Sequence, residues 1–561
     1  MSGILLAIGM AVWLFGGYFI YGKFIEKKLI QPKGDPTPAV SMNDGVDYYP
    51  AKKELLFGHH FSSIAGAGPI VGPLVGVLFF GWFFVVLWIL VGSIFAGAVH
   101  DYITLMASVR NQGKSIAHIS ENQLGRQVMT VFSIFIWLTL VLVIAVFGDV
   151  TAKTLVKRPE IVIPTIGLVL IALVFGWAVY RRGLPVWIGT IIALVLLAAF
   201  LYLGELYPIE IPDNALGLGI GPEQAWFWIL MLYCLAASVL PVWILLQPRD
   251  YLSTWILFLG LGLGYLGVFF ARPEIGAPTI TSFNTDKGTL WPMLFVIVAC
   301  GAFSGFHSLV SGGTTSKQLA DERQGLFVGY GSMITEALLA GLVVIIAAAA
   351  LTWNPDKTNV HLGFQYLMDG KLGGGPIVAF ATGFGQLTKA LPAMTFAAGL
   401  YFGMLMLNAF VITSLDTSTR LGRFIIGELG GQRFKFLSNR YIGTIVTVIA
   451  AALLGATGGY KVIWPVFGAT NQLVAALSIL VATAWLMSRD KPKWYTLAPG
   501  MFMLITTVSA LAYQAYHFLI VSKGTWKNHL LGTLAILLVA LAGYIAWSSR
   551  GLLTGRFGKN H

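Results

Sequence analysis

The sequence has few charged residues. Asp, Glu, Lys and Arg together make up 11% of the 561 residues, whereas hydrophobic residues make up 57%. A soluble domain carries about 25% charged residues, so this composition excludes a soluble protein and predicts one that crosses a membrane many times. Cysteine is scarce as well. Cys234 and Cys300 both lie inside apolar runs, and they predict no disulfide framework.

Several motifs of enzymes and pumps are missing. The chain has no phosphate-binding loop of the form Gly-x4-Gly-Lys-Ser/Thr, no Gly-x-Ser-x-Gly nucleophile elbow and no His-Glu-x-x-His metal motif. An ATP-driven pump and an intramembrane hydrolase therefore lack support. We expect a protein that is not an enzyme and that holds no cofactor and no metal ion.

Apolar runs long enough to cross a bilayer, about 20 residues each, predict an all-α polytopic membrane protein with about 15 spans. The glycine-rich stretch 373–391, within the segment 362–391, is expected to be interfacial or re-entrant. The spans are predicted near residues 3–22, 57–78, 82–108, 128–149, 161–180, 184–204, 225–246, 251–271, 290–313, 327–351, 394–415, 441–459, 462–487, 496–520 and 529–548.

The basic residues predict the orientation in the membrane. The net charge of +12 comes from lysines and arginines in short loops, where membrane orientation and lipid phosphates explain them better than nucleic acid does. Most of them lie on the side of the loop 23–53, which is therefore expected to be cytoplasmic. An odd number of spans then places the N-terminus outside and the C-terminus in the cytoplasm.

The stretch 57–78, FGHHFSSIAGAGPIVGPLVGVL, is the most informative span. Proline lacks the amide hydrogen of the helical ladder and clashes with the preceding turn, so the helix is expected to break between Gly66 and Pro69. An unwound backbone at membrane depth must line a cavity or be buried in protein. Broken helices are typical of transporter binding sites, while the alternative is a proline kink that only aids packing.

A second interruption is expected five spans later, in residues 225–246, at Ser238, Leu240 and Pro241. That span runs in the opposite direction, as an inverted five-plus-five repeat requires; the alternative is a chance proline. The repeats would cover 57–205 and 225–415. A first helix with a basic loop (1–56) would precede them, and further membrane helices (416–561) would follow.

Polar residues line one face of several predicted spans. His59, Ser62, Ser63 and Gly66 recur at helical spacing, so they share a face that should look into the bundle. The ninth span carries a similar stripe, whose hydroxyls are candidates for a sodium site or for a vestigial one beside proton coupling: Ser311, Thr314 and Thr315. Such hydroxyls also serve helix packing in membranes.

Ionisable residues inside spans are costly and usually mark a substrate or proton path. Glu336 has no basic neighbour in sequence, so it is a candidate proton carrier or a carboxyl held for structure. Asp416, which precedes Arg420 by one helical turn, is a candidate proton carrier or, alternatively, is simply paired with Arg420. The complete set of such residues is His59, His60, His100, Asp101, His307, Glu336 and Asp416.

Several long segments closely resemble the carbon starvation protein A family. They are LFGHHFSSIAGAGPIVGP (56–73), AGAVHDY (96–102), LPVWILLQPRDYL (240–252), ACGAFSGFHSLVSGGTTSKQLA (299–320), SLDTSTRLGRF (414–424) and WPVFGATNQLVAA (464–476). The resemblance implies the inverted-repeat fold of the amino acid, polyamine and organocation transporters. It also implies inner-membrane import of peptides or of pyruvate, the latter by proton symport, in some relatives beside a small accessory protein.

Together these observations predict a secondary active importer of a small carboxylate such as pyruvate. The substrate would bind at Gly66, Ala67, Gly68, Ile70 and Ser238. Protons, or alternatively sodium, would be coupled through His59, His60, Ser63, Asp101, His307, Ser311, Thr314, Thr315, Glu336 and Asp416. The alternatives are a peptide importer and, from another class, a nutrient sensor or channel on a transporter fold.

Overall fold

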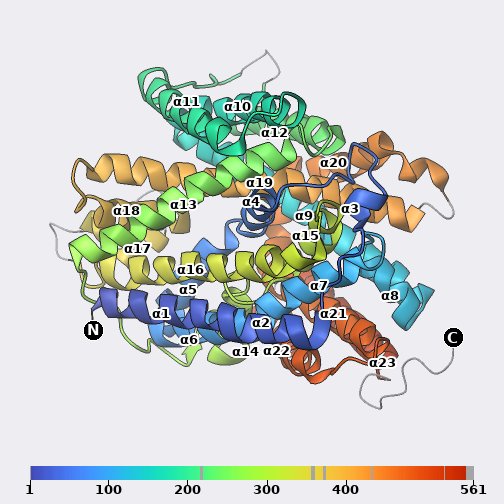
Figure 1. Cartoon of the computed structure of the whole chain (residues 1–561). Coiled ribbons are helices and arrows are strands. Elements are labelled where there is room, and N and C mark those ends of the chain that lie inside the picture. The colour runs from blue at the N-terminus through green and yellow to red at the C-terminus, as the bar shows by residue number, and fades with distance from the viewer. Residues whose placement is uncertain are drawn as a thin grey trace.

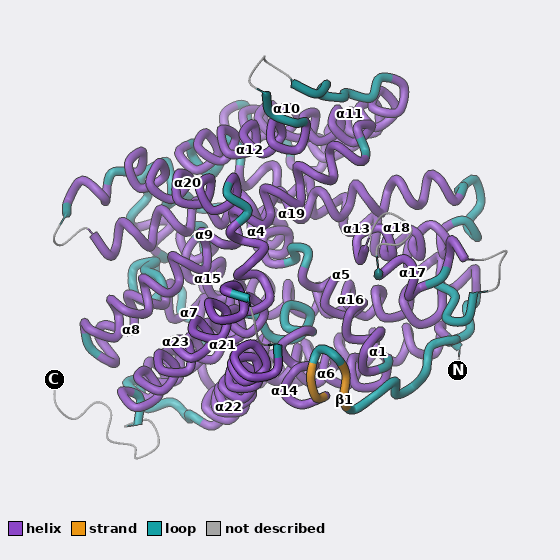
Figure 2. Tube along the Cα trace, turned by 180° about the vertical axis from the view of Figure 1, so that it is seen from behind, coloured by secondary structure: helices purple, strands orange, loops and turns teal. Residues whose placement is uncertain are grey.

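The predicted apolar runs correspond to helices in the computed structural model, which describes residues 2–214, 219–355, 360–369, 375–430, 434–522 and 525–550. The only strands in these ranges form the short hairpin of β1 (Asn284–Thr285) and β2 (Gly288–Thr289). The axes of most long helices are roughly aligned with one another (Figures 1 and 2). The described residues therefore form an all-α bundle.

Eleven helical segments of the described chain are long and apolar enough to cross a membrane, and a bent pair makes a possible twelfth. Three further expected spans correspond to α12 (Pro222–Val239), α20 (Arg440–Ala456) and a second broken helix. The expected number of about 15 spans is therefore compatible with the structure. The eleven segments are Gly3–Ile30 with α1 (Gly3–Gly17), Trp82–Val109 with α6 (Trp82–Gly92) and α7 (Ala98–Val109), α9 (Arg126–Lys157), Pro159–Arg181 with α10 (Val162–Arg181), α11 (Val186–Leu206), α13 (Leu246–Ala271), Glu322–Ala350 with α16 (Gly331–Ile345), α19 (Phe396–Gly430), Pro465–Met487 within α21 (Gly459–Met487), Trp494–Val521 with α22 (Trp494–Tyr516), and α23 (Trp526–Ser548).

The two longest helices, α9 and α19, pack along each other near the centre of the bundle. Helix α19 also contacts α12, α13 and α20, while α21 contacts α7, α22 and α23. The α10–α11 hairpin lies at one edge of the molecule and packs against α13, and α22 and α23 lie at the opposite edge (Figures 1 and 2). The centre of the bundle is thus built from α4, α9, α13 and α19.

The predicted break in the first polar span is confirmed. Helix α4 (Lys53–Ile64) ends where residue Ala65 leaves helical geometry, and α5 (Gly68–Phe80) begins with Pro69 in its first turn. The two halves are bent by 42°. Proline suits the first turn of a helix because its missing amide hydrogen would have no partner there, so the new half-helix starts at this position.

The second break differs from the prediction. Residues 225–246 do not form one interrupted span, because α12 ends at Val239 and a separate helix, α13, begins at Leu246. Instead, the expected continuous span 290–313 is broken into α14 (Leu290–Ile297) and α15 (Gly305–Gly313). Helix α14 packs on α5 and α15 packs on α4, so the two broken helices lie side by side in opposite directions.

The remaining α-helices are short. The stretch expected to be interfacial or re-entrant contains α18 (Gly375–Thr388), which packs against α13 and α19; residues 373 and 374 at its start lie outside the described ranges. The other short helices are α2 (Lys23–Ile25), α3 (Pro38–Ser41), α8 (Ile116–Leu124) and α17 (Phe364–Met368).

The close packing of the two broken helices makes a prediction about Gly72. A Cβ there would lie 2.6 Å from the carbonyl oxygen of Ile297, and such overpacking typically costs about 1–3 kcal/mol. We expect Gly72→Ala to lower the thermal unfolding temperature of the detergent-solubilised protein. Gly262→Ala is the matched control, because a Cβ at Gly262 meets nothing within 4 Å. Equal melting temperatures for Gly72→Ala and the wild type would contradict this packing.

Candidate functional site

The carbonyl groups at the end of α4 are reached by hydroxyl groups of α19. Thr413 Oγ1 lies 3.0 Å from the Ser62 carbonyl oxygen, and Ser414 Oγ lies 3.0 Å from that of Ser63. The last carbonyls of a helix have no partner within it, and lipid offers none. Gly66 permits this approach, since a Cβ there would lie 2.9 Å from Ser414 Oγ. Helix α19 therefore stabilises the broken end.

A network centred on Arg249 lies beside this break. Arg249 Nη2 donates to Asp250 at 2.5 Å and to Asp416 at 2.9 Å, and Nη1 donates to Asp416 and to the Tyr233 hydroxyl. His59 Nδ1 lies 2.6 Å from the other oxygen of Asp250. We call these residues the Arg249 cluster: His59 (α4), Tyr233 (α12), Arg249 and Asp250 (α13), and Asp416 (α19).

The polar stripes of the two broken helices meet at the same place. His59 Nε2 lies 3.1 Å from Thr314 Oγ1, and His60 Nδ1 lies 2.8 Å from Thr315 Oγ1. Ser63 Oγ is 3.4 Å from His59 Nδ1. The structure therefore brings together five of the residues that the sequence singled out, from segments more than 250 positions apart in sequence.

A second buried network lies between α7, α15 and α16. Asp101 accepts from His100 Nδ1 and from His307 Nδ1, each at 3.0 Å. His307 Nε2 lies 3.2 Å from a carboxylate oxygen of Glu336. All four side chains are fully buried, and we call them the Asp101 cluster. These ionisable groups form a continuous line, which brings together Asp101, His307 and Glu336, three of the residues for which the sequence predicts proton coupling.

The expected pairing of Asp416 with Arg420 is wrong. Asp416 bonds to Arg249 instead, while Arg420 Nη1 and Arg423 Nη2 both donate to Asp47, at 2.6 and 2.7 Å. Burial alone would raise the pKa of Asp47, but the two guanidinium groups outweigh it and hold that pKa below its ordinary value. Asp47 thereby ties the loop before α4 to the end of α19.

The expected substrate-binding amides are only partly available. The amide groups of Gly66 and Ile70 bond to nearby backbone carbonyls at 2.9 and 3.2 Å. The amide groups of Ala67 and Gly68 have no acceptor among the described residues, and both residues are only half-buried. These two amides are therefore the ones at the break that can receive an anion.

Two expected site residues take no part in these networks. Ser238 lies against α20, where its hydroxyl is 3.0 Å from that of Thr444. The Ser311 hydroxyl is buried without a hydrogen-bond partner in the described part of the chain. The structure thus does not join Ser238 to the break, and it leaves Ser311 free to bind a water or a ligand.

Sequence reasoning missed Arg249, Asp250 and Tyr233. The first two were assigned to a short loop between predicted spans, but α13 begins at Leu246 and buries both. The signal was the motif QPRDYL, because a buried charge pair beside an apolar helix is rare without a functional reason. Thr413 and Ser414 were also missed, since hydroxyls on a long helix are common.

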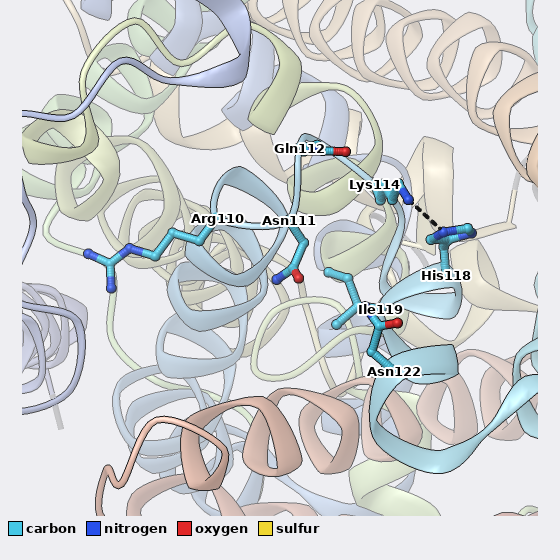
Figure 3. A pocket seen from close by; sticks show the side chains of 7 residues that line it. All are labelled: Arg110, Asn111, Gln112, Lys114, His118, Ile119 and Asn122. Carbon is cyan, nitrogen blue, oxygen red and sulfur yellow. Dashed lines mark hydrogen bonds between the residues drawn. The ribbon is translucent and has the colours of Figure 1, made fainter. Parts of the chain in front are cut away.

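One cavity of the described structure lies at the α7–α8 connection, and a much smaller one lies beside Arg249. A pocket of about 260 Å³ at the α7–α8 connection is lined by basic and amide side chains, including Arg110 and Lys114, whose amino group points toward His118 (Figure 3). Beside Arg249 there is a cavity of only about 10 Å³ between α10, α11, α13 and α19. That volume holds roughly one water molecule, so the central site is closed in this conformation.

Comparison with solved structures defines the class of the protein. The manganese transporter of Eremococcus coleocola, solved with an aromatic bis-isothiourea compound, has a TM-score of 0.51 at 12% identity, over 92% of this chain and 99% of that one. A mutant of the same transporter, H236A, gives 0.50 over 89% and 95%. The chain therefore has a transporter fold and is a multi-pass membrane protein.

The family follows from the sequence comparisons. The family model described as carbon starvation protein CstA matches residues 1–359 and 370–510, and the chain belongs to this family. The peptide transporter CstA of Escherichia coli K12 is 33% identical over 88% of this chain and 78% of its own length. The pyruvate/proton symporter BtsT of the same organism is 32% identical over 89% and 80%. These relatives are transporters, consistent with a protein that is not an enzyme.

The Asp101 cluster predicts strong coupling between two side chains. Asp101→Asn and His307→Gln should each lower the melting temperature markedly, because removing one partner of a buried ion pair costs about 3–5 kcal/mol. The double variant should lose much less than the sum of the single losses. The control pair is Asp149→Asn with Lys153→Gln, which breaks a partly exposed contact of 2.6 Å worth at most about 1 kcal/mol. Additive losses at Asp101 and His307 would contradict the cluster.

Proposed function

We propose that this protein imports a small carboxylate such as pyruvate together with protons. The observation that carries the proposal is the pair of buried, ionisable clusters packed around two broken helices. The name of one relative, a pyruvate/proton symporter, supports the same substrate and coupling ion. The site would lie in the cell inner membrane, with the N-terminus outside and the C-terminus in the cytoplasm, as the basic loops indicate.

The charge balance of the clusters supports proton coupling. The Arg249 cluster holds two carboxylates and one guanidinium, so one further proton makes it neutral, and the short contact between His59 and Asp250 is the place for it. The Asp101 cluster holds two carboxylates and two imidazoles, so two protons make it neutral. Buried net charge is costly, and both clusters therefore bind and release protons when the surroundings change.

The arrangement of the helices supports a revised pair of inverted repeats. The first repeat would contain α4–α5, α6–α7, α9, α12 and α13. Their counterparts in the second repeat would be, in the same order, α14–α15, the span of α16, α19, α20 and α21. The broken helices pack in opposite directions, and the long helices α9 and α19 pair with each other, as this correspondence requires. The repeats would then cover 53–271 and 290–487, and α10–α11 would be an insertion. Rocking of one bundle against the other would give alternating access.

The substrate carboxylate would first meet the free amides of Ala67 and Gly68. These lie at the N-terminal end of α5, where the helix dipole favours negative charge. Sodium remains the alternative coupling ion, and its site would be the carbonyls of Ser62 and Ser63 with the hydroxyls of Thr413 and Ser414. A small accessory protein, which the family resemblance implies, would complete the system.

A peptide importer is the second candidate function, because the E. coli relative at 33% identity is named a peptide transporter. A short peptide also ends in a carboxylate, so the free amides of Ala67 and Gly68 and the guanidinium of Arg249 could receive it. The larger substrate would need a wider opening between the broken helices than the closed state provides.

The first test is uptake of radiolabelled pyruvate into proteoliposomes with an imposed proton gradient, a sodium gradient or neither. We expect accumulation with the proton gradient alone, and Glu336→Gln should reduce it to the level without a gradient, because the amide cannot carry the proton. Asp149→Asn is the control and should accumulate pyruvate as the wild type does.

The other outcomes are equally informative. Accumulation driven by sodium alone would assign the coupling to the hydroxyl groups of α19. If a labelled dipeptide accumulates and pyruvate does not, the peptide function is correct and the pyruvate assignment is wrong. Currents far above carrier turnover would instead indicate a channel.

A further inference from the structure

All five N–H groups of Arg249 are already used. Nε and Nη2 donate to Asp250, while Nη1 and Nη2 hold both oxygens of Asp416, and Nη1 also reaches the Tyr233 hydroxyl. The guanidinium is fully buried. An arginine has no further donors, so an incoming anion can bind it only by displacing a group that the protein itself supplies, namely one of the two carboxylates or the Tyr233 hydroxyl.

Asp416 is the carboxylate that can leave. Asp250 is held from its other side by His59, whereas among the described residues Asp416 is hydrogen-bonded to Arg249 and Tyr233 alone. The groups that face Asp416 are Tyr233 and Cys234 on α12, Arg249 and Asp250 on α13, and His59 on α4 beyond Asp250. Arg420 on α19 points away to Asp47. No second cation among the described residues compensates Asp416 if Arg249 is taken from it.

Unsatisfied polar atoms lie next to the same arginine. The cavity beside Arg249 is also lined by Ser253 and Asn408, and Ser253 Oγ and Asn408 Oδ1 are buried without hydrogen-bond partners in the described chain. Buried polar atoms are rarely left unpaired. Their position indicates a polar group that visits this cavity when it widens.

We propose that Asp416 is the exchange partner of the substrate: its carboxylate leaves Arg249 when it takes a proton, and the substrate's carboxylate takes its place. In this step one O–H bond forms on Asp416, two N–H···O contacts to Asp416 break, and two form to the substrate. The cluster gains one proton and one anion, so its net charge does not change. This inference rests on the proposed carboxylate import and assigns the proton that accompanies the substrate at Arg249 to one side chain.

The exchange makes binding and protonation inseparable. A substrate anion without a proton would leave Asp416 charged and unpaired in a buried site, which is costly. A proton without a substrate would leave the guanidinium with too few acceptors. On the cytoplasmic side, loss of the proton lets Asp416 recover Arg249 and release the substrate. Each carboxylate therefore travels with one proton at this site.

The test compares pyruvate binding to the purified full-length protein and to Asp416→Asn between about pH 6 and pH 8. For the wild type, affinity should fall by up to about tenfold for each pH unit, as one linked proton requires. Asp416→Asn imitates the protonated carboxyl, so it should bind at pH 8 at least about tenfold more tightly than the wild type, with no pH dependence. It should still exchange labelled for unlabelled pyruvate in proteoliposomes but should not accumulate it. Arg249→Gln should bind at least about tenfold more weakly at all pH values.

The controls separate this inference from the proposed function. Asp149→Asn, which changes an ion pair with Lys153 outside the Arg249 cluster, should behave as the wild type. If Asp416→Asn keeps the wild-type pH dependence and accumulation, the exchange is wrong while proton symport stands. If the wild type itself neither binds nor accumulates pyruvate under a proton gradient, the proposed function fails instead. Should Asp416→Asn not fold, Asp416→Glu must shift the pH midpoint of binding, and an unchanged midpoint overturns the proposal.

Discussion

The break in the helix formed by α4 and α5 is the constraint on which the rest of the structure depends. A backbone that leaves helical geometry at membrane depth must find its hydrogen-bond partners within the protein. Helix α19 provides them through Thr413 and Ser414, and α15 meets the histidines of α4 through Thr314 and Thr315. The need to satisfy one unwound segment therefore brings together helices from both halves of the chain.

The same packing explains why charge can be kept inside. The charged residues of the Arg249 cluster, Arg249, Asp250 and Asp416, lie on α13 and α19, and both of these helices contact α4. Each charged group has an opposite charge within hydrogen-bond distance. The Asp101 cluster is built in the same way from three other helices. Neither cluster has an excess of fixed positive charge, so protons would complete the charge balance in the coupling that we propose.

The sequence predicted the local features well and the long-range pairings poorly. The break at Gly66–Pro69 could be predicted because proline and glycine act within one turn of the chain. The break at residues 298–304 could not, since that stretch contains no proline and its contact with α5 joins segments far apart in the sequence. Pro241 marked the end of a helix rather than an interruption within a span. The pairing of Asp416 with Arg420 followed from helical spacing, but the guanidinium of Arg249, 167 positions away, was the stronger partner.

The α10–α11 hairpin has a consequence for the electrical environment of the site. It closes the cavity beside Arg249 on the side away from the bundle centre, and its outer face carries large apolar side chains such as Val174, Trp187 and Val195. The hairpin therefore acts as insulation between a buried guanidinium and the hydrocarbon of the bilayer. A carrier built in this way can hold an arginine one helix layer beneath its lipid-facing surface, because the hairpin keeps the guanidinium out of contact with the hydrocarbon.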